Sequence, residues 1–132
     1  MTEKALVRQF VSALTSKAQF IGTEVSNFHR SADIAAIMEN GEVWVVECKL
    51  SAISKAIEQL QTHMMSADKV YLGLPKKRRN IATIDKINTA GFGLLEIDEQ
   101  GELCEVIPAK LRETPTSHFK KVLMNNITAV SQ

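Results

Sequence analysis

The sequence predicts an α/β protein whose helices cover a mixed β-sheet. Helical periodicity marks four segments, and β-forming runs lie between them. Two of these runs, residues 32–38 and 42–50, are apolar on both faces, which predicts strands in the middle of a covered sheet. The chain has 132 residues and a hydrophobic fraction of 45%, enough for one domain over residues 1–132 with a real core.

The N-terminal half predicts one helix followed by three strands. The helix should run from a cap at Thr2 to about Gln19, because apolar residues recur there at helical spacing. The strands should cover residues 20–28, 32–38 and 42–50. The sequence ENGE between the last two strands is a hairpin signal.

The C-terminal half predicts two helices around a buried strand, then a late hairpin and a last helix. The strand should cover residues 69–74, and the helices about 52–66, capped by Ser51, and about 77–90, ended by Gly91. The remaining expectations are a hairpin around Gln100-Gly101, a turn over Thr114 to Ser117, and a helix after that turn.

Charge and cysteine content narrow the class of protein. The net charge of +1 neither supports nor excludes a nucleic-acid partner. Cys48 and Cys104 both lie in strand-like apolar contexts, so we expect reduced core residues in a cytoplasmic protein. The N-terminus lacks the apolar region of a signal peptide, and no apolar run is long enough to cross a membrane, so no membrane partner is expected.

Three charged residues interrupt the apolar pattern of the central strands. Thirteen residues separate Asp33 from Glu47, and Lys49 follows soon after. A buried charge is costly unless it is paired or binds a metal, so the three predict a structural ion cluster or a functional site. Two carboxylates can hold Mg²⁺, with the Cys48 carbonyl as a further ligand, and a neighbouring lysine can orient or deprotonate a water that attacks phosphorus.

The register of the hairpin decides whether Asp33 shares a site with Glu47. A two-residue loop would place the two carboxylates on opposite faces of the sheet. A three-residue loop, with Gly41 in the left-handed conformation, would set Asp33 opposite Glu47. The second register also packs the small Ala36 against the bulky Trp44, so we predict the three-residue loop.

The pattern of Asp33, Glu47 and Lys49, after a helix and a strand and before an amphipathic helix, resembles the PD-(D/E)xK nuclease superfamily. That superfamily includes restriction endonucleases, RecB-type nucleases and archaeal Holliday-junction resolvases. The resemblance implies a restriction endonuclease-like αβββαβ core over about residues 2–74, with a C-terminal extension over about 75–132. It further implies Asp33 and Glu47 as ligands of Mg²⁺, for which Mn²⁺ substitutes, and Lys49 as the catalytic lysine.

The resemblance also points to residues outside this trio. Members often carry a further metal-binding carboxylate, for which Glu3 on the first helix and Glu24 on the first strand are the candidates. Gln59 is similar to a glutamine of RecB-like members, although His63 stands where those members often have tyrosine. Ala32 stands where many members have proline before the aspartate.

Basic and polar residues near the site are candidates for contact with nucleic acid. The alternative for each is an ordinary solvated surface residue. The candidates are Arg30, Lys55, Gln59, Lys76, Lys77, Arg78 and Arg79.

The sequence therefore predicts a metal-dependent endonuclease that hydrolyses DNA phosphodiester bonds in repair, recombination or defence. DNA is the expected partner, and a homodimer or a larger complex would supply two sites for two strands. Two alternatives stay open. One is a non-catalytic nucleic-acid-binding or assembly protein on the same fold, and the other is a nuclease subunit that needs a partner protein.

Overall fold

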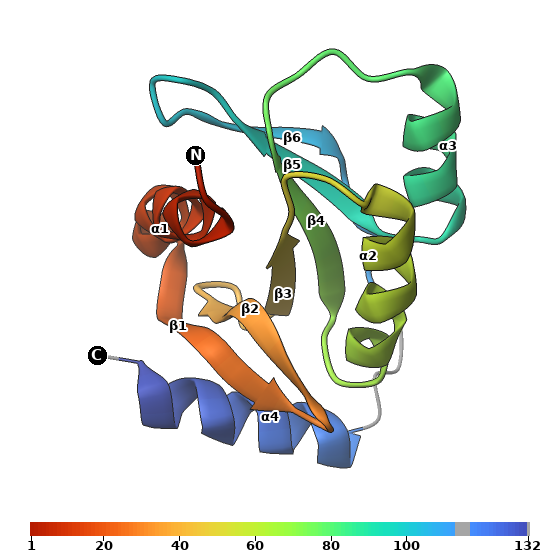
Figure 1. The fold of residues 1–132 in the computed structure, drawn as a ribbon. Helices are drawn as coiled ribbons and strands as arrows, with labels where there is room; N and C mark the ends of the chain where they lie inside the picture. Colours follow the sequence, from red (N-terminus) through yellow and green to blue (C-terminus); the bar gives the residue numbers. More distant parts are fainter. Residues whose placement is uncertain (113–116, 132) are drawn as a thin grey trace.

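A six-stranded mixed sheet in the order β1-β2-β3-β4-β5-β6 forms the centre of the molecule (Figure 1). The computed structural model describes residues 1–112 and 117–131. The strands are β1 (Ala18–Asn27), β2 (Arg30–Met38), β3 (Val43–Cys48), β4 (Lys69–Pro75), β5 (Gly93–Ile97) and β6 (Leu103–Ile107). Strands β3, β4 and β5 are parallel neighbours, whereas β1, β2 and β6 join by antiparallel pairing. The predicted mixed α/β class is confirmed, and the strands predicted at 32–38 and 42–50 are internal strands of the sheet, although the second covers only 43–48.

Helices cover both faces of this sheet (Figure 1). They are α1 (Glu3–Leu14), α2 (Ile53–Leu60), α3 (Ile81–Thr89) and α4 (Ser117–Val130), with short 3-10 turns η1 (Thr15–Lys17) and η2 (Gln61–Met65). Helix α1 packs on one face, and α2, α3 and α4 contribute to the apolar core of the other face. No helix within the described ranges is both long and apolar enough to span a membrane.

The α1 face shows how the sequence positions one wall of the site. Leu6, Phe10 and Leu14 recur at helical spacing and are fully buried, as the stripe predicted. Burying a side chain of this size stabilises the fold by about 1.5–3 kcal/mol. The Phe10 ring fits because Gly73 on β4 has no side chain: a Cβ there would lie 3.0 Å from that ring.

The predicted end of the first helix is wrong. Helix α1 begins after Thr2, whose hydroxyl accepts a hydrogen bond from the Ala5 N–H, but it ends at Leu14 instead of Gln19. A 3-10 turn follows, and β1 begins at Ala18, which pairs with Met38. From Ala18 on, the backbone forms hydrogen bonds with β2, and these bonds could not form if the helix continued.

Two helix starts also differ from expectation. Ser51 does not cap α2, because the chain enters that helix through Ala52 in the left-handed conformation, with φ of 57°. Helix α3 starts at Ile81, not near residue 77, because the Asn80 side chain accepts a hydrogen bond from the N–H of Thr83. The end of α3 is as predicted, with Gly91 at a φ of 84°.

The late hairpin and the last helix are confirmed as β5, β6 and α4. Cys48 is buried as predicted, but Cys104 is exposed, because it lies on the edge strand β6. Both cysteines are free thiols. Residues 114–116 of the predicted turn lie outside the described residues, and Ser117 is the first residue of α4.

The predicted three-residue loop joins β2 to β3. Met38 N–H donates to the Glu42 carbonyl, which leaves residues 39–41 as the loop, and Gly41 has a φ of +88°. The strands pair Ala36 with Trp44, as predicted from the match of a small and a large side chain. This loop fixes the register on which the site depends.

We expect Gly41→Val to lower the free energy of unfolding by about 1–2 kcal/mol, since a left-handed backbone strains an L side chain. A Cβ at this position meets no atom of the described residues within 4 Å, so the loss reports backbone strain alone. Urea unfolding measures it, with Gly41→Asn as the control, because asparagine tolerates this conformation better. Equal stability of the wild type and the Val variant would contradict the register argument.

Candidate active site

Strands β2 and β3 separate where they carry the charged residues. Their pairing runs from Ile37–Val43 to Ile34–Val46, and one more step of this register sets Asp33 opposite Glu47. At that step, hydrogen bonds from the backbone of one strand to a side chain of the other replace the hydrogen bonds between the two backbones. The Cys48 N–H donates to Asp33 Oδ2 at 2.9 Å, and the Asp33 N–H donates to Glu47 Oε1 at 3.3 Å. Each carboxylate is therefore held by the backbone of the opposite strand.

The two carboxyl groups are close enough to perturb each other. Burial, together with the negative charge of Glu47, raises the pKa of Asp33 to about 7. The Cys48 N–H and the positive charge of Lys49 act in the opposite direction. Near neutral pH the pair therefore favours a proton or a cation between its oxygens. A set of hard carboxylate oxygens suits Mg²⁺, so the residues present fit the metal that the resemblance implies.

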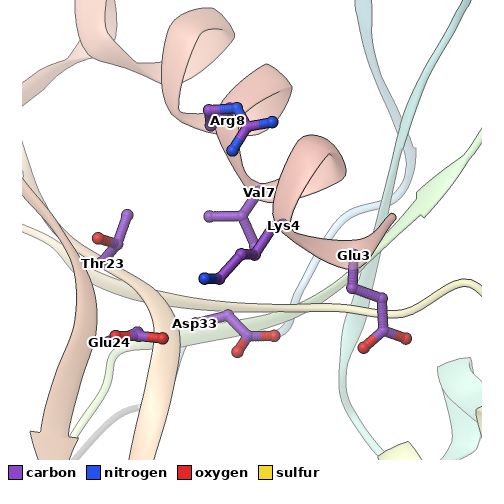
Figure 2. Close-up of a pocket in the computed structure, with 7 residues that line it drawn as sticks. All are labelled: Glu3, Lys4, Val7, Arg8, Thr23, Glu24 and Asp33. Carbon is purple, nitrogen blue, oxygen red and sulfur yellow. The ribbon is translucent and has the colours of Figure 1, made fainter. Parts of the chain in front are cut away.

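A cavity of about 450 Å³ opens beside Asp33 on the α1 face (Figure 2). It is lined by Glu3, Lys4, Val7, Arg8, Thr23, Glu24 and Asp33. Glu3 Oε2 accepts a hydrogen bond from the Leu50 N–H at 3.1 Å, and Glu24 has a strained φ of 49°. Among the described residues, no three His, Cys, Asp or Glu side chains converge to hold a metal ion, so neither Glu3 nor Glu24 completes a three-ligand set here.

A second cavity, of about 280 Å³, opens beside Glu47 on the α2 face. It is lined by His29, Arg30, Ser31, Glu47, Gln59 and His63. Glu47 itself is only 6% exposed, so its carboxylate forms the floor of this cavity. The Asp33–Glu47 pair thus lies between two cavities on opposite faces of the sheet.

Sequence reasoning treated the histidines as scattered and missed a contact of His63. Its Nε2 lies 3.0 Å from Glu47 Oε1, and its side chain is 1% exposed. The signal was present in the spacing, because residue 63 continues the inward stripe of Ile53, Ile57 and Leu60. The position of His63 on this apolar stripe therefore indicated that its side chain is buried and needs a polar partner.

The basic loop follows β4 at the same end of the sheet as the site, since β3 and β4 are parallel neighbours. Lys76, Lys77 and Arg78 are exposed in this loop. Arg79 differs, because its Nε donates to Glu96 Oε2 at 3.0 Å and its Nη2 donates to the Pro75 carbonyl at 2.6 Å. Arg79 therefore ties the loop to the sheet and is poorly placed to bind phosphate.

The other predicted contact residues are divided between the two cavities. Arg30 and Gln59 line the cavity beside Glu47, whereas Lys55 is exposed one turn before Gln59 on α2. Two basic residues were missed: Lys4 and Arg8, one turn apart on α1, line the cavity beside Asp33. Figure 2 shows the Lys4 side chain pointing from the helix toward the strands.

Comparison with known proteins identifies the fold but no family. No family model and no curated protein matches the sequence. A protein of unknown function from Silicibacter pomeroyi is similar in structure over 94% of this chain and 82% of its own, with a TM-score of 0.72 and 21% identity.

Two further solved structures, a repair endonuclease and a complex with double-stranded DNA, are similar over 74% of this chain. A repair endonuclease from Pyrococcus abyssi is similar over 74% of this chain and 48% of its own, with a TM-score of 0.58 and 14% identity. An EndoMS–dsDNA2 complex is similar over 74% of this chain and 46% of its own, with a TM-score of 0.53 and 15% identity. This chain thus spans about half the length of each, and its fold is restriction endonuclease-like.

The pKa of Asp33 predicts a pH-dependent stability. Because the pKa is about 7 in the folded protein against an ordinary 3.8, the folded state holds a proton that the unfolded chain releases. Stability contributed by that proton is lost as the pH rises from about 4 to about 7.

Asp33→Asn should therefore be more stable than the wild type above pH 7, by about 1–2 kcal/mol after allowance for partial solvation, with no difference near pH 4. Asparagine keeps an oxygen that can accept the Cys48 N–H. Thermal unfolding without metal at several pH values measures the difference, with exposed Glu99→Gln as the control. Parallel pH profiles for Asp33→Asn and the wild type would refute the shared-proton description.

Proposed function

We propose that this protein is a metal-dependent nuclease of PD-(D/E)xK type that hydrolyses DNA phosphodiester bonds. The observation that carries the proposal is the Asp33–Glu47 pair, held by reciprocal backbone hydrogen bonds, with the charge of Lys49 beside it. Two facing carboxylates that favour a cation, next to one amine, are the groups that phosphodiester hydrolysis requires. The restriction endonuclease-like fold, shared with two endonucleases, supports the same reading.

In this proposal Asp33 and Glu47 hold Mg²⁺, together with the Cys48 backbone carbonyl. The Cys48 thiol is buried in the core under α1, so its sulfur does not compete with the carboxylate oxygens. When bound, Mg²⁺ supplies a Lewis acid that polarises the phosphate and lowers the pKa of water. The protein's own contribution is to hold the two carboxyl groups beside each other and to fix their directions with backbone donors.

Lys49 lies just beyond the last residue of β3 and is partly buried. Its ammonium charge already stabilises the ionised form of Asp33. The same position suits an amine that orients the attacking water and offsets negative charge on the phosphate in the transition state.

Basic side chains at this end of the protein provide the proposed DNA interface. Exposed Lys76, Lys77 and Arg78 follow β4, and Lys4 and Arg8 line the cavity that ends at Asp33. Such residues position a phosphate backbone without reading its sequence. Double-stranded DNA is the substrate class that the EndoMS–dsDNA2 neighbour supports, and DNA repair is the context that the repair endonuclease neighbour supports.

A nuclease subunit that relies on a partner for DNA binding is the second candidate. The net charge of +1 favours it, since a free-standing DNA-binding protein usually carries a stronger basic balance. The two candidates differ in a simple test. A dependent subunit binds Mn²⁺ through Asp33 and Glu47 but cuts DNA only when its partner is added.

We expect the wild-type protein to cleave labelled DNA with Mg²⁺ or Mn²⁺, and Lys49→Ala to lose about 10²–10⁴-fold in rate. A panel of duplex, flap, junction and single-stranded substrates, followed by gel analysis, measures this. Lys121→Ala, which changes an exposed lysine of α4 that lines neither cavity, serves as the control and should cut at a rate close to that of the wild type. Undiminished cutting by Lys49→Ala would remove the lysine from the mechanism.

The basic loop should act through charge alone. Lys77→Ala is expected to weaken DNA binding equally for all sequences and to reduce the slope of log affinity against log salt by about one. Lys17→Ala is the control, because Lys17 is exposed beside the Glu39 turn at the opposite end of the sheet. Fluorescence anisotropy over a salt series measures both slopes, and equal slopes for both variants would exclude the loop from the interface.

A further inference from the structure

A chain of buried polar side chains leads from the carboxylate of Glu47 into the core. His63 Nε2 lies 3.0 Å from Glu47 Oε1, and His63 Nδ1 lies 2.8 Å from Asn27 Nδ2. Ser66 Oγ then donates to Asn27 Oδ1 at 2.9 Å. The four side chains come from β3, η2, the last residue of β1 and the residue after η2, so the chain joins three parts of the fold.

This chain has a defined direction of donation. Because Ser66 Oγ donates to Asn27 Oδ1, the Asn27 amide must present its NH₂ group to His63. Nδ1 of the imidazole is therefore the acceptor, and its single proton lies on Nε2, where it is donated to Glu47. Ser66 thus determines the tautomer of His63 by way of Asn27, although its hydroxyl forms no hydrogen bond with the imidazole ring.

The hydrogen bonds to Glu47 also select one of its two oxygens. Among the described residues, the His63 ring and the Asp33 N–H both donate to Oε1. Oε2 takes part in neither of these hydrogen bonds, so it is the oxygen left for a cation shared with Asp33. A carboxylate fixed through one oxygen presents the other in a single direction, which lowers the entropy lost when it takes a ligand.

We propose that Ser66, Asn27 and His63 form a positioning relay that holds Glu47 in its metal-binding orientation. This inference rests on the proposed function, because it assigns the relay to the metal site of the nuclease. Asn27, His63 and Ser66 are each at most 5% exposed, so we infer that they act through Glu47. Burying four polar side chains for packing alone is unfavourable compared with apolar residues of the same volume, which argues for a task beyond stability.

The test is the affinity for Mn²⁺ alone, measured by isothermal titration calorimetry on the whole protein. His63→Phe keeps the ring volume but removes the N–H, and we expect it to weaken Mn²⁺ binding by about 10–100-fold. His63→Gln keeps an N–H that can reach Glu47 and should recover most of that affinity. A role in packing alone predicts the reverse order, because phenylalanine fills the apolar stripe better than glutamine does.

A second variant covers the case in which His63→Phe does not fold. Ser66→Ala removes only the hydroxyl that orients the Asn27 amide. It should fold, and it should bind Mn²⁺ several-fold more weakly than the wild type, because the amide is then free to present either face to His63. Mn²⁺ affinity equal to that of the wild type in Ser66→Ala and in any folded His63 variant would overturn the relay.

Asp33→Asn separates failure of the relay from failure of the metal site. If Asp33→Asn abolishes Mn²⁺ binding while the relay variants bind normally, the metal site stands and the relay is wrong. If Asp33→Asn binds Mn²⁺ with the affinity of the wild type, both the proposed metal site and the proposed relay are wrong. In the unaltered protein, Mg²⁺ should shift the NMR signal of the His63 Nε2–H, and an unmoved signal at saturating Mg²⁺ also overturns the relay.

Discussion

Two carboxyl groups from neighbouring strands meet where the backbone ladder between β2 and β3 stops. The rest of the site is arranged around that contact: the backbone N–H groups of Asp33 and Cys48 hold the carboxylates, and burial raises the pKa of Asp33. The contact is unfavourable unless something positive lies between the groups. The helices on both faces supply the packing energy that keeps two such groups together.

The contact depends on a turn at the far end of the same two strands. Gly41 in the left-handed conformation produces a three-residue loop, and that loop sets every pair along the ladder. This part could be predicted from the sequence, because a glycine turn and a match of small with large side chains are local properties. The buried stripe of α1 could be predicted for the same reason.

What the sequence did not predict depends on tertiary contacts. Helix α1 ends before the predicted residue because Ala18 pairs with a residue of β2. Helix α2 begins after Ala52, which is in the left-handed conformation and forms no side-chain cap, so the sequence carries no signal for this start. The apolar context of Cys104 predicts a core residue, but its strand lies at the edge of the sheet, and this position cannot be known from the local sequence. The link from His63 to Glu47 joins residues sixteen positions apart and needs the helix rotation to be known.

The carboxyl pair lies where the pairing of β2 with β3 ends, with one cavity on each face of the sheet. Most sheets separate their two sides completely, since paired backbone leaves no passage. Here each face has its own opening beside one carboxyl group, Asp33 on the α1 side and Glu47 on the α2 side. A ligand that fills the α1 cavity would therefore cover Asp33 and leave the opening beside Glu47 uncovered.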